Sequence, residues 1–345
     1  MPKVFLKKRP GVTNKLPPVF GTRRLAPCLA LLICLAVLFS LPLPALALDL
    51  PLCFSGRRIV IPGPENSQVA RIFEHLAPLV AGEGAPPTLL FHPGRGGGYA
   101  LRDLGAEKTD GCAMAGLMTP SFFYQLAAPN SLVQREEISV CVISAQSPNA
   151  LWVAEDSPFT SWEQFHAHAR AAADDPVSQL LIAGSGSFTD QHMATFQLNR
   201  AAGIKVGYSP VLGSEQAAKA VQAGKALACW GYALDAGSMP GMRPLAVAAT
   251  QRSVALPETP TFKELGVNCV NSALFSFAVS AAVPEKRRQA LRESFKKGKP
   301  GHIRSLPGLM DHDIKIGDVD IFMNILQEQA KSALDDYPML GPALR

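Results

Sequence analysis

Residues 58–80 read RIVIPGPENSQVARIFEHLAPLV, and within this stretch the hydrophobic pattern changes from that of a strand to that of a helix. The run 58–61 is short, apolar and β-branched, as a buried strand is. After the Pro/Gly-rich turn 62–66, apolar residues recur every three or four positions and so share one helical face. Those residues are Val69, Ile72, Phe73, Leu76 and Val80. The stretch predicts one strand–loop–helix unit of an α/β fold.

The same alternation of strand-like and helix-like patterns continues along the chain. Further strands are predicted at 88–92, 112–117, 138–144, 150–154, 180–183, 206–210, 227–231, 244–249 and 273–279, and a helix at 214–223. Thr160 with Glu163, and Thr261 with Glu264, have the spacing of capping boxes, and Asp190 is expected to cap the helix that follows it. Pro284 suits the first turn of a long basic helix. These patterns predict α/β layers around a mainly parallel sheet.

The predicted elements divide into two α/β units between which the chain crosses twice, near 150 and near 270. We therefore expect two lobes joined by a two-crossing hinge. Lobe I would comprise 48–150 and 269–345, and lobe II 151–268. Small-molecule sites favour the interface between such lobes.

The N-terminal 47 residues have the three parts of a secretory signal. Residues 1–24 contain seven basic and no acidic residues, residues 25–41 are apolar, and Ala45-Leu46-Ala47 is a small-x-small cleavage site. A membrane anchor is the alternative, but 17 apolar residues are at the lower limit for a span and Pro42 ends the run. We expect cleavage near Ala47 and export to the periplasm.

Removal of this segment changes the charge of the chain. The 33 basic residues fall by seven to 26, against 28 acidic residues, a net charge of about −2. The mature chain therefore has no overall positive field that would attract nucleic acid or a membrane surface.

Five cysteines would remain in the mature chain, Cys53, Cys112, Cys141, Cys229 and Cys269. Their wide spacing indicates neither a disulfide framework nor a zinc site, although one disulfide is possible.

Three segments resemble the substrate-binding receptors of tripartite tricarboxylate transporters, often called the Bug family. They are 153–162 (VAEDSPFTSW), the Gly/Ser loop and helix from Gly184 to Ile204, and 243–266, which contains LPETPTFKELG. The third is the most specific, and the resemblance covers roughly residues 57–334.

The resemblance implies a type II periplasmic-binding-protein fold and delivery of a small organic acid to the membrane permease subunits of a transporter. It also implies that backbone N–H groups and waters from two loops of the first lobe hold the ligand carboxylate, and that the second lobe closes over it. The chain departs from the family after its first strand, where a Gly-Gly pair and an Asp usually follow. Here the residues are Pro64, Glu65, Asn66 and Ser67.

The loops before predicted helices supply the candidate ligand-binding residues, because helix N-termini bind anions without side-chain cations. Glycines allow close backbone approach, hydroxyls donate hydrogen bonds, and Glu65 would pair with a ligand amine. The candidates are Pro64, Glu65, Asn66, Ser67, Gly96, Gly97, Gly98, Asn149, Ser185, Gly186, Ser187, Thr189 and Tyr208. For several of them a structural role is the alternative: a glycine turn, capping by the hydroxyls and Asn66, or a buried Tyr208. Arg95 is expected in solvent.

No catalytic or metal motif is present in the expected form. The loop 94–99 lacks the last glycine of a dinucleotide-binding loop, and 183–187 is not a nucleophile elbow. His166 and His168 lie two apart on a helix and so face different sides. We expect a monomeric binding protein with no cofactor and no metal. A sensor that docks on a signalling protein, and a secreted hydrolase that uses Ser185, remain the alternatives.

Overall fold

The computed structural model describes residues 56–81, 86–105, 111–126, 131–172, 180–302, 310–311 and 323–328. These all belong to one compact unit, Pro51–Arg345. The predicted signal segment 1–47 and Cys53 lie outside the described residues. In the described part of the chain, no helix is both long and apolar enough to span a bilayer.

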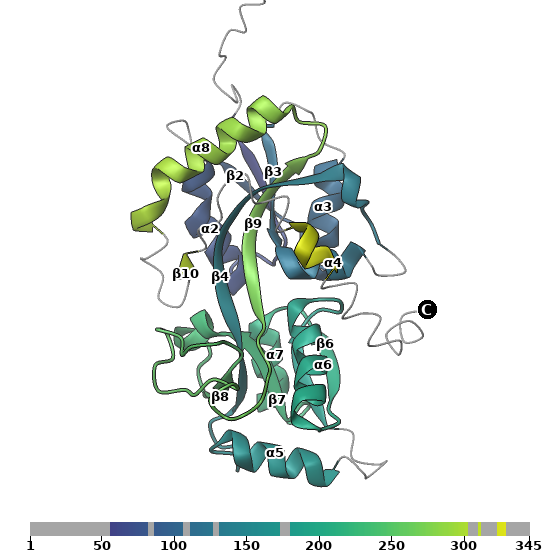
Figure 1. Ribbon diagram of the computed structural model, residues 1–345, viewed down its shortest axis with the longest axis vertical. Coiled ribbons are helices and arrows are strands. Elements are labelled where there is room, and N and C mark those ends of the chain that lie inside the picture. The colour runs from purple at the N-terminus through teal and green to yellow at the C-terminus, as the bar shows by residue number, and fades with distance from the viewer. Residues whose placement is uncertain are drawn as a thin grey trace, which may run out of the picture. The chain divides into compact units, whose positions relative to one another are not determined.

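The described elements alternate between strands and helices, as the sequence pattern predicts (Figure 1). The strands are β1 (Arg58–Ile61), β2 (Thr88–Phe91), β3 (Ala113–Met118), β4 (Ile138–Ala154), β5 (Leu181–Ser185), β6 (Gly207–Val211), β7 (Ala228–Tyr232), β8 (Met242–Val247), β9 (Ser272–Ser280) and β10 (Met310–Asp311). The helices are α2 (Gln68–Ala81), α3 (Gly98–Gly105), α4 (Thr119–Leu126), α5 (Trp162–Ala171), α6 (Asp190–Ala202), α7 (Ser214–Gln222) and α8 (Glu285–His302), with short 3-10 turns η1 (Arg95–Gly97), η2 (Arg135–Glu137) and η4 (Ala233–Gly237).

The strands form two lobes that share the long strand β4. The order along the hydrogen-bonded path is β2-β1-β3-β9-β4-β7-β5-β6. We call the part built on β2, β1 and β3 the first lobe and the part built on β7, β5 and β6 the second lobe. The partner of β4 changes from β9 to β7 between Pro148 and Asn149, and the chain returns into β9 at Ser272. Figure 1 shows β4 and β9 side by side along this path.

The expectation of a mainly parallel sheet holds only for the outer strands. β1 is parallel to β2 and β3, and β5 is parallel to β6 and β7. β4 is antiparallel to β7, β8, β9 and β10, and β3 is antiparallel to β9. The two strands that cross between lobes run in opposite directions, so the centre of the sheet is antiparallel. The lobe boundaries given above stay a prediction.

Each lobe has an apolar core on both faces of its sheet, because successive strand residues point to opposite faces. In the first lobe, Phe73 of α2 packs edge-on against Phe275 and Phe277 of β9, at ring-centroid distances of 5.9 and 5.5 Å. In the second lobe, Trp162 of α5 packs edge-on against Phe262 at 5.0 Å. Two separate cores allow each lobe to hold its loops in place independently.

Two of the predicted helix caps are wrong by one residue. Ser161, not Thr160, precedes α5, and Thr160 instead bonds Gln164. Thr189, not Asp190, caps α6, with its hydroxyl accepting from the amide of His192 at 3.3 Å.

The predicted pair Thr261 and Glu264 does form a reciprocal capping box. Among the cysteines, Cys112 is disulfide-bonded, and Cys141, Cys229 and Cys269 are buried free thiols.

Candidate ligand-binding site

A cavity of about 280 Å³ lies where the carboxyl ends of strands from the two lobes face each other. Loops that follow β1 and β2 line it from the first lobe, and loops that follow β5 and β6 line it from the second. Met118, the last residue of β3, completes the wall. The lining segments are 62–69, 94–96, 185–186 and 211–216. This is the place where open α/β sheets bind their ligands.

Two helices, one from each lobe, begin at the wall of this cavity. The first turn of α2 enters the wall with Gln68 and Val69, and the first turn of α7 with Ser214, Glu215 and Gln216. The first amides of a helix have no intrahelical acceptor, and this end of the helix dipole is positive. Opposed helix N-termini therefore give the cavity donors suited to an anion.

Most amides in the first turns of α2 and α7 remain available to a ligand, because capping groups occupy few of them. Ser67 caps α2 by accepting from the amide of Ala70 at 3.2 Å, and the amides of Gln68 and Val69 have no acceptor among the described residues. Gly213 precedes α7 and has no side chain with which to cap it. The amides of the first turn of α7 likewise have no acceptor in the described part of the chain.

The glycines Gly96 and Gly186 bring the loops of the two lobes close together. Both have positive φ, 58° and 73°, which favours glycine. A Cβ on Gly186 would lie 3.8 Å from the amide nitrogen of Gly96, and a Cβ on Gly96 would lie 2.3 Å from Nε2 of Gln125. Gln125 donates that same Nε2 to the carbonyls of Ser187 and Phe188, at 2.8 and 3.0 Å. A larger residue at Gly96 would displace the Gln125 side chain and so break this link between the lobes.

Three residues other than glycine have positive φ in the described residues, and all lie in loops at the cavity. They are Asn66 (65°), Arg95 (48°) and Phe188 (53°). Asn66 and Arg95 line the cavity, and Phe188 follows the lining residues Ser185 and Gly186. Such backbone strain concentrates at functional sites, where the surrounding structure maintains it.

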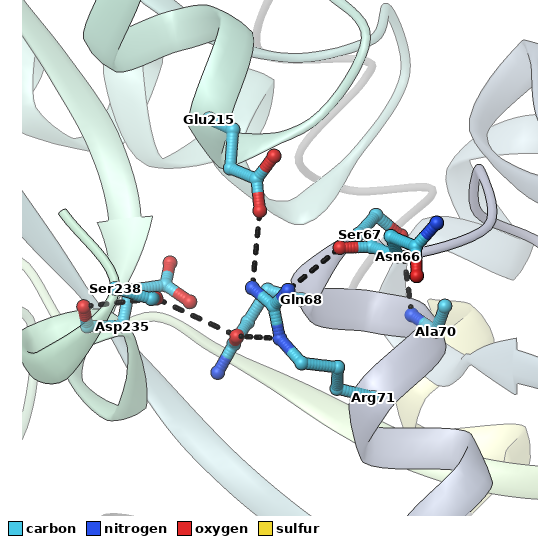
Figure 2. A network of polar contacts seen from close by, with 8 residues as sticks. All are labelled: Asn66, Ser67, Gln68, Ala70, Arg71, Glu215, Asp235 and Ser238. Carbon is cyan, nitrogen blue, oxygen red and sulfur yellow. Dashed lines mark hydrogen bonds and ion pairs between the residues drawn. The ribbon is translucent and has the colours of Figure 1, made fainter.

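An ion pair joins the lobes at the edge of the cavity (Figure 2). Nη2 of Arg71 on α2 lies 3.0 Å from Oε1 of Glu215 on α7. The same guanidinium donates to the carbonyl of Asn66 at 2.6 Å and to Oε1 of Gln68 at 2.9 Å. Both charged side chains are more than two-fifths exposed, so the pair contributes about 0–1 kcal/mol to stability. Its main effect is to neutralise Glu215.

Asp235, close to this ion pair, is a fully buried carboxyl group. Its Oδ2 accepts the amide of Tyr232 at 2.7 Å, whereas Oδ1 has no hydrogen-bond partner. Burial raises the pKa of Asp235 to about 6, and the amide of Tyr232 and the charge of Arg71 offset only part of that rise. This carboxyl group therefore changes its protonation between mildly acidic and neutral pH.

Replacement of Asp235 by Asn is expected to remove a pH dependence of stability. A carboxyl group whose pKa is higher in the folded state makes that state lose stability as pH rises from the unfolded pKa to the folded pKa. A rise from 3.8 to about 6 corresponds to about 3 kcal/mol. Between pH 4.5 and 7.5, urea denaturation should show Asp235→Asn gaining about 2 kcal/mol relative to wild type. An unchanging difference would contradict the raised pKa.

A buried hydrogen-bonded network links the two lobes. Asp190, the first residue of α6, accepts from Oγ of Ser121 on α4 and from Nδ2 of Asn149 on β4, both at 2.8 Å. Asn149 also donates to Oδ1 of Asn271 at 2.6 Å, and so joins the two crossing segments. Burial raises the pKa of Asp190, while these hydrogen bonds oppose the rise. The network fixes α6 relative to both crossings.

Tyr208 and His192 support the loop after β5 rather than lining the cavity. The two rings stack at a centroid distance of 4.3 Å, and the Tyr208 hydroxyl donates to the carbonyl of Gly186 at 2.9 Å. Nδ1 of His192 accepts the amide of Phe188 at 3.2 Å. Burial lowers the pKa of His192 to about 4, so the ring is neutral at neutral pH. These contacts fix the position of the Gly186 carbonyl and of the Phe188 backbone, which has a positive φ.

Seven of the thirteen sequence-predicted site residues line the cavity. They are Pro64, Glu65, Asn66, Ser67, Gly96, Ser185 and Gly186. The other six are not among the lining residues. Thr189 caps α6, Asn149 is in the buried network, Tyr208 bonds Gly186, the Ser187 carbonyl accepts from Gln125, Gly97 is buried and Gly98 begins α3.

The sequence prediction missed the segment 211–216, from the end of β6 through the first turn of α7, which supplies six of the lining residues. The signal was present, because strand 206–210 and helix 214–223 were both predicted in this region. Parallel strands place their carboxyl ends at the same edge, so the end of β6 had to lie beside that of β5. Arg95, expected in solvent, is exposed but also lines the cavity.

Residues 93–334 match the family model described as tripartite tricarboxylate transporter family receptor. A curated relative from Cupriavidus necator, "UPF0065 protein in gbd 5'region", is 24% identical over 219 residues. That match covers 62% of this chain and 65% of the relative, so the chain spans slightly under two thirds of the relative's length.

Two solved structures show the same fold. MatC from Rhodopseudomonas palustris with bound malate has a TM-score of 0.69 at 15% identity, over 81% of this chain and 98% of that one. An R. palustris protein with adipate has a TM-score of 0.73 at 16% identity, over 81% and 96%. These likenesses confirm the expected two-lobed α/β binding-protein fold. The family model matches well over half of this chain, and the chain therefore belongs to the tripartite tricarboxylate transporter receptor family.

Proposed function

We propose that this protein is a periplasmic receptor that captures a small carboxylate in the cavity between its lobes and delivers it to the membrane subunits of a tripartite transporter. The observation that carries the proposal is the meeting of two helix N-termini, those of α2 and α7, at one cavity. Family membership and the malate and adipate in the related structures support it.

The proposed mechanism of capture is hydrogen bonding of the ligand carboxylate by backbone amides. Each helix N-terminus acts as about half a positive charge, so two of them compensate about one carboxylate. Gly96 and Gly186 keep both loops free of Cβ atoms where the lobes approach. The ion pair between Arg71 and Glu215 and the link from Gln125 to the loop after β5 favour the arrangement in which the lobes enclose the ligand.

Thermal denaturation of the purified protein against a panel of organic acids tests capture. We expect one chemical class of acid to raise the melting temperature. A ligand at a hundredfold excess over its dissociation constant stabilises the folded state by about 2.7 kcal/mol. The panel would contain mono-, di- and tricarboxylates, both aliphatic and aromatic. Absence of stabilisation by all of these acids would contradict the proposal.

Uptake of the acid identified in this way tests delivery. Cells that lack the receptor are expected to lose uptake of the labelled acid and to regain it when the receptor is restored. Unchanged uptake, with loss only of a transcriptional response to the acid, would favour the sensor instead.

A further inference from the structure

We propose that Glu65 receives the amino group of the ligand, so that the receptor selects carboxylates that carry an amine over the same acids without one. This inference rests on the proposed function, because it assigns the ligand class of the same cavity. Glu65 lines the cavity from the loop between β1 and α2, beside the start of α2.

The loop holds Glu65 in a defined position. Pro64 precedes it, and the amide of Ser67 donates to the carbonyl of Pro64 at 3.1 Å, which closes a turn around Glu65 and Asn66. The positive φ of Asn66 belongs to this turn, and the Asn66 carbonyl accepts from Arg71. The backbone on both sides of Glu65 is thus held by two hydrogen bonds next to the cavity.

The charges at the cavity leave this carboxylate without compensation from a neighbour. Of the two acidic residues in the wall, Glu215 forms the ion pair with Arg71. The Glu65 side chain is exposed and forms no hydrogen bond or ion pair with another described residue. A carboxylate that lines a ligand cavity without a protein partner is suited to a cationic group of the ligand.

The other polar groups of the cavity wall are suited to the carboxylate end of such a ligand. The amides of the α2 and α7 first turns compensate about one negative charge. A ligand whose second group is also a carboxylate would bring like charges together at Glu65. A ligand with an ammonium group there would instead form a pair of opposite charges, which favours it.

Isothermal titration calorimetry with pairs of acids that differ only by the amine tests the inference. The pairs are succinate and aspartate, glutarate and glutamate, propionate and β-alanine, and 3-phenylpropionate and phenylalanine. For the skeleton that fits the cavity, we expect wild type to bind the amino acid about tenfold more tightly than its amine-free partner, because a hydrogen bond to a charged group is worth about 1.5–3 kcal/mol. In Glu65→Gln, this ratio is expected to fall by about tenfold, with the affinity of the amine-free acid unchanged or increased.

Glu74→Gln is the matched control. Glu74 is an exposed residue on the same helix, α2, outside the cavity wall, and its replacement removes the same charge. The ratio in this variant should equal that of wild type. Equal affinities within every pair, or equal weakening of both members by Glu65→Gln, would overturn the inference while leaving carboxylate capture intact. Absence of binding by all eight acids, with stabilisation by another acid of the wider panel, would overturn the inference alone. Absence of binding by every acid of both sets would overturn the proposed function as well.

Discussion

The Ser214→Pro variant is expected to bind the ligand carboxylate about 10- to 100-fold more weakly than Ser214→Ala. Ser214 is the first residue of α7, and it lines the cavity. Proline lacks the backbone N–H but is compatible with the first position of a helix. The substitution therefore removes one donor from the cavity and leaves α7 in place. A hydrogen bond to a charged group is worth about 1.5–3 kcal/mol, which gives the expected range.

Ser214→Ala is the control, because it removes the same hydroxyl and keeps the amide. Calorimetry gives the two affinities, and circular dichroism with melting temperatures shows whether both variants are folded. Equal affinities in two folded variants would show that the first amide of α7 does not bind the ligand.

The Asp190→Ala variant is expected to lose about 3 kcal/mol of stability. Asp190 is almost fully buried, and its two carboxylate oxygens accept from Ser121 and Asn149. Alanine would leave the Ser121 hydroxyl without its acceptor and Nδ2 of Asn149 with Oδ1 of Asn271 alone, at about 1–3 kcal/mol for a buried donor that loses its partner. Denaturation by urea, followed by tryptophan fluorescence and circular dichroism, measures the loss and shows whether the lobes unfold together.

Asp190→Asn separates hydrogen bonding from charge. The amide oxygen can replace one acceptor, the amide NH₂ cannot accept from the other donor, and the cost of burying a charge disappears. We therefore expect a smaller loss than in Asp190→Ala, about 1–2 kcal/mol. Stability of Asp190→Ala equal to that of wild type would show that the network does not hold the lobes together.

The sequence predicted most helices and strands well, because their apolar residues recur at the regular spacing of each type of element. In residues 58–80, the change of period places β1 and α2 as the structure has them. Strand direction is not encoded in such a pattern, which explains why the antiparallel pairing of β4 with β9 was missed. Cap positions depend on backbone angles as well as residue type, so Ser161 rather than Thr160 precedes α5.

The lining of the candidate site was predicted in part, from Gly- and Ser-rich loops that lie between strands and helices. Gly96, Gly186 and the segment 64–67 follow strands and precede helices, and all line the cavity. Thr189 and Asn149 have the same polar character but face the interior, where they satisfy buried partners. Residue type alone does not distinguish these two orientations. The segment 211–216 was missed because Val211 and Leu212 are apolar and so do not have the residue types expected of ligand contacts.

A crystal structure of the protein with its co-purified or added acid is the most direct test of the account. We predict one ligand carboxylate about 3 Å from amide nitrogens in the first turns of both α2 and α7, with no lysine or arginine side chain as its main partner. A ligand held elsewhere, or a carboxylate in this cavity bound by side-chain cations while those amides face solvent, would contradict it.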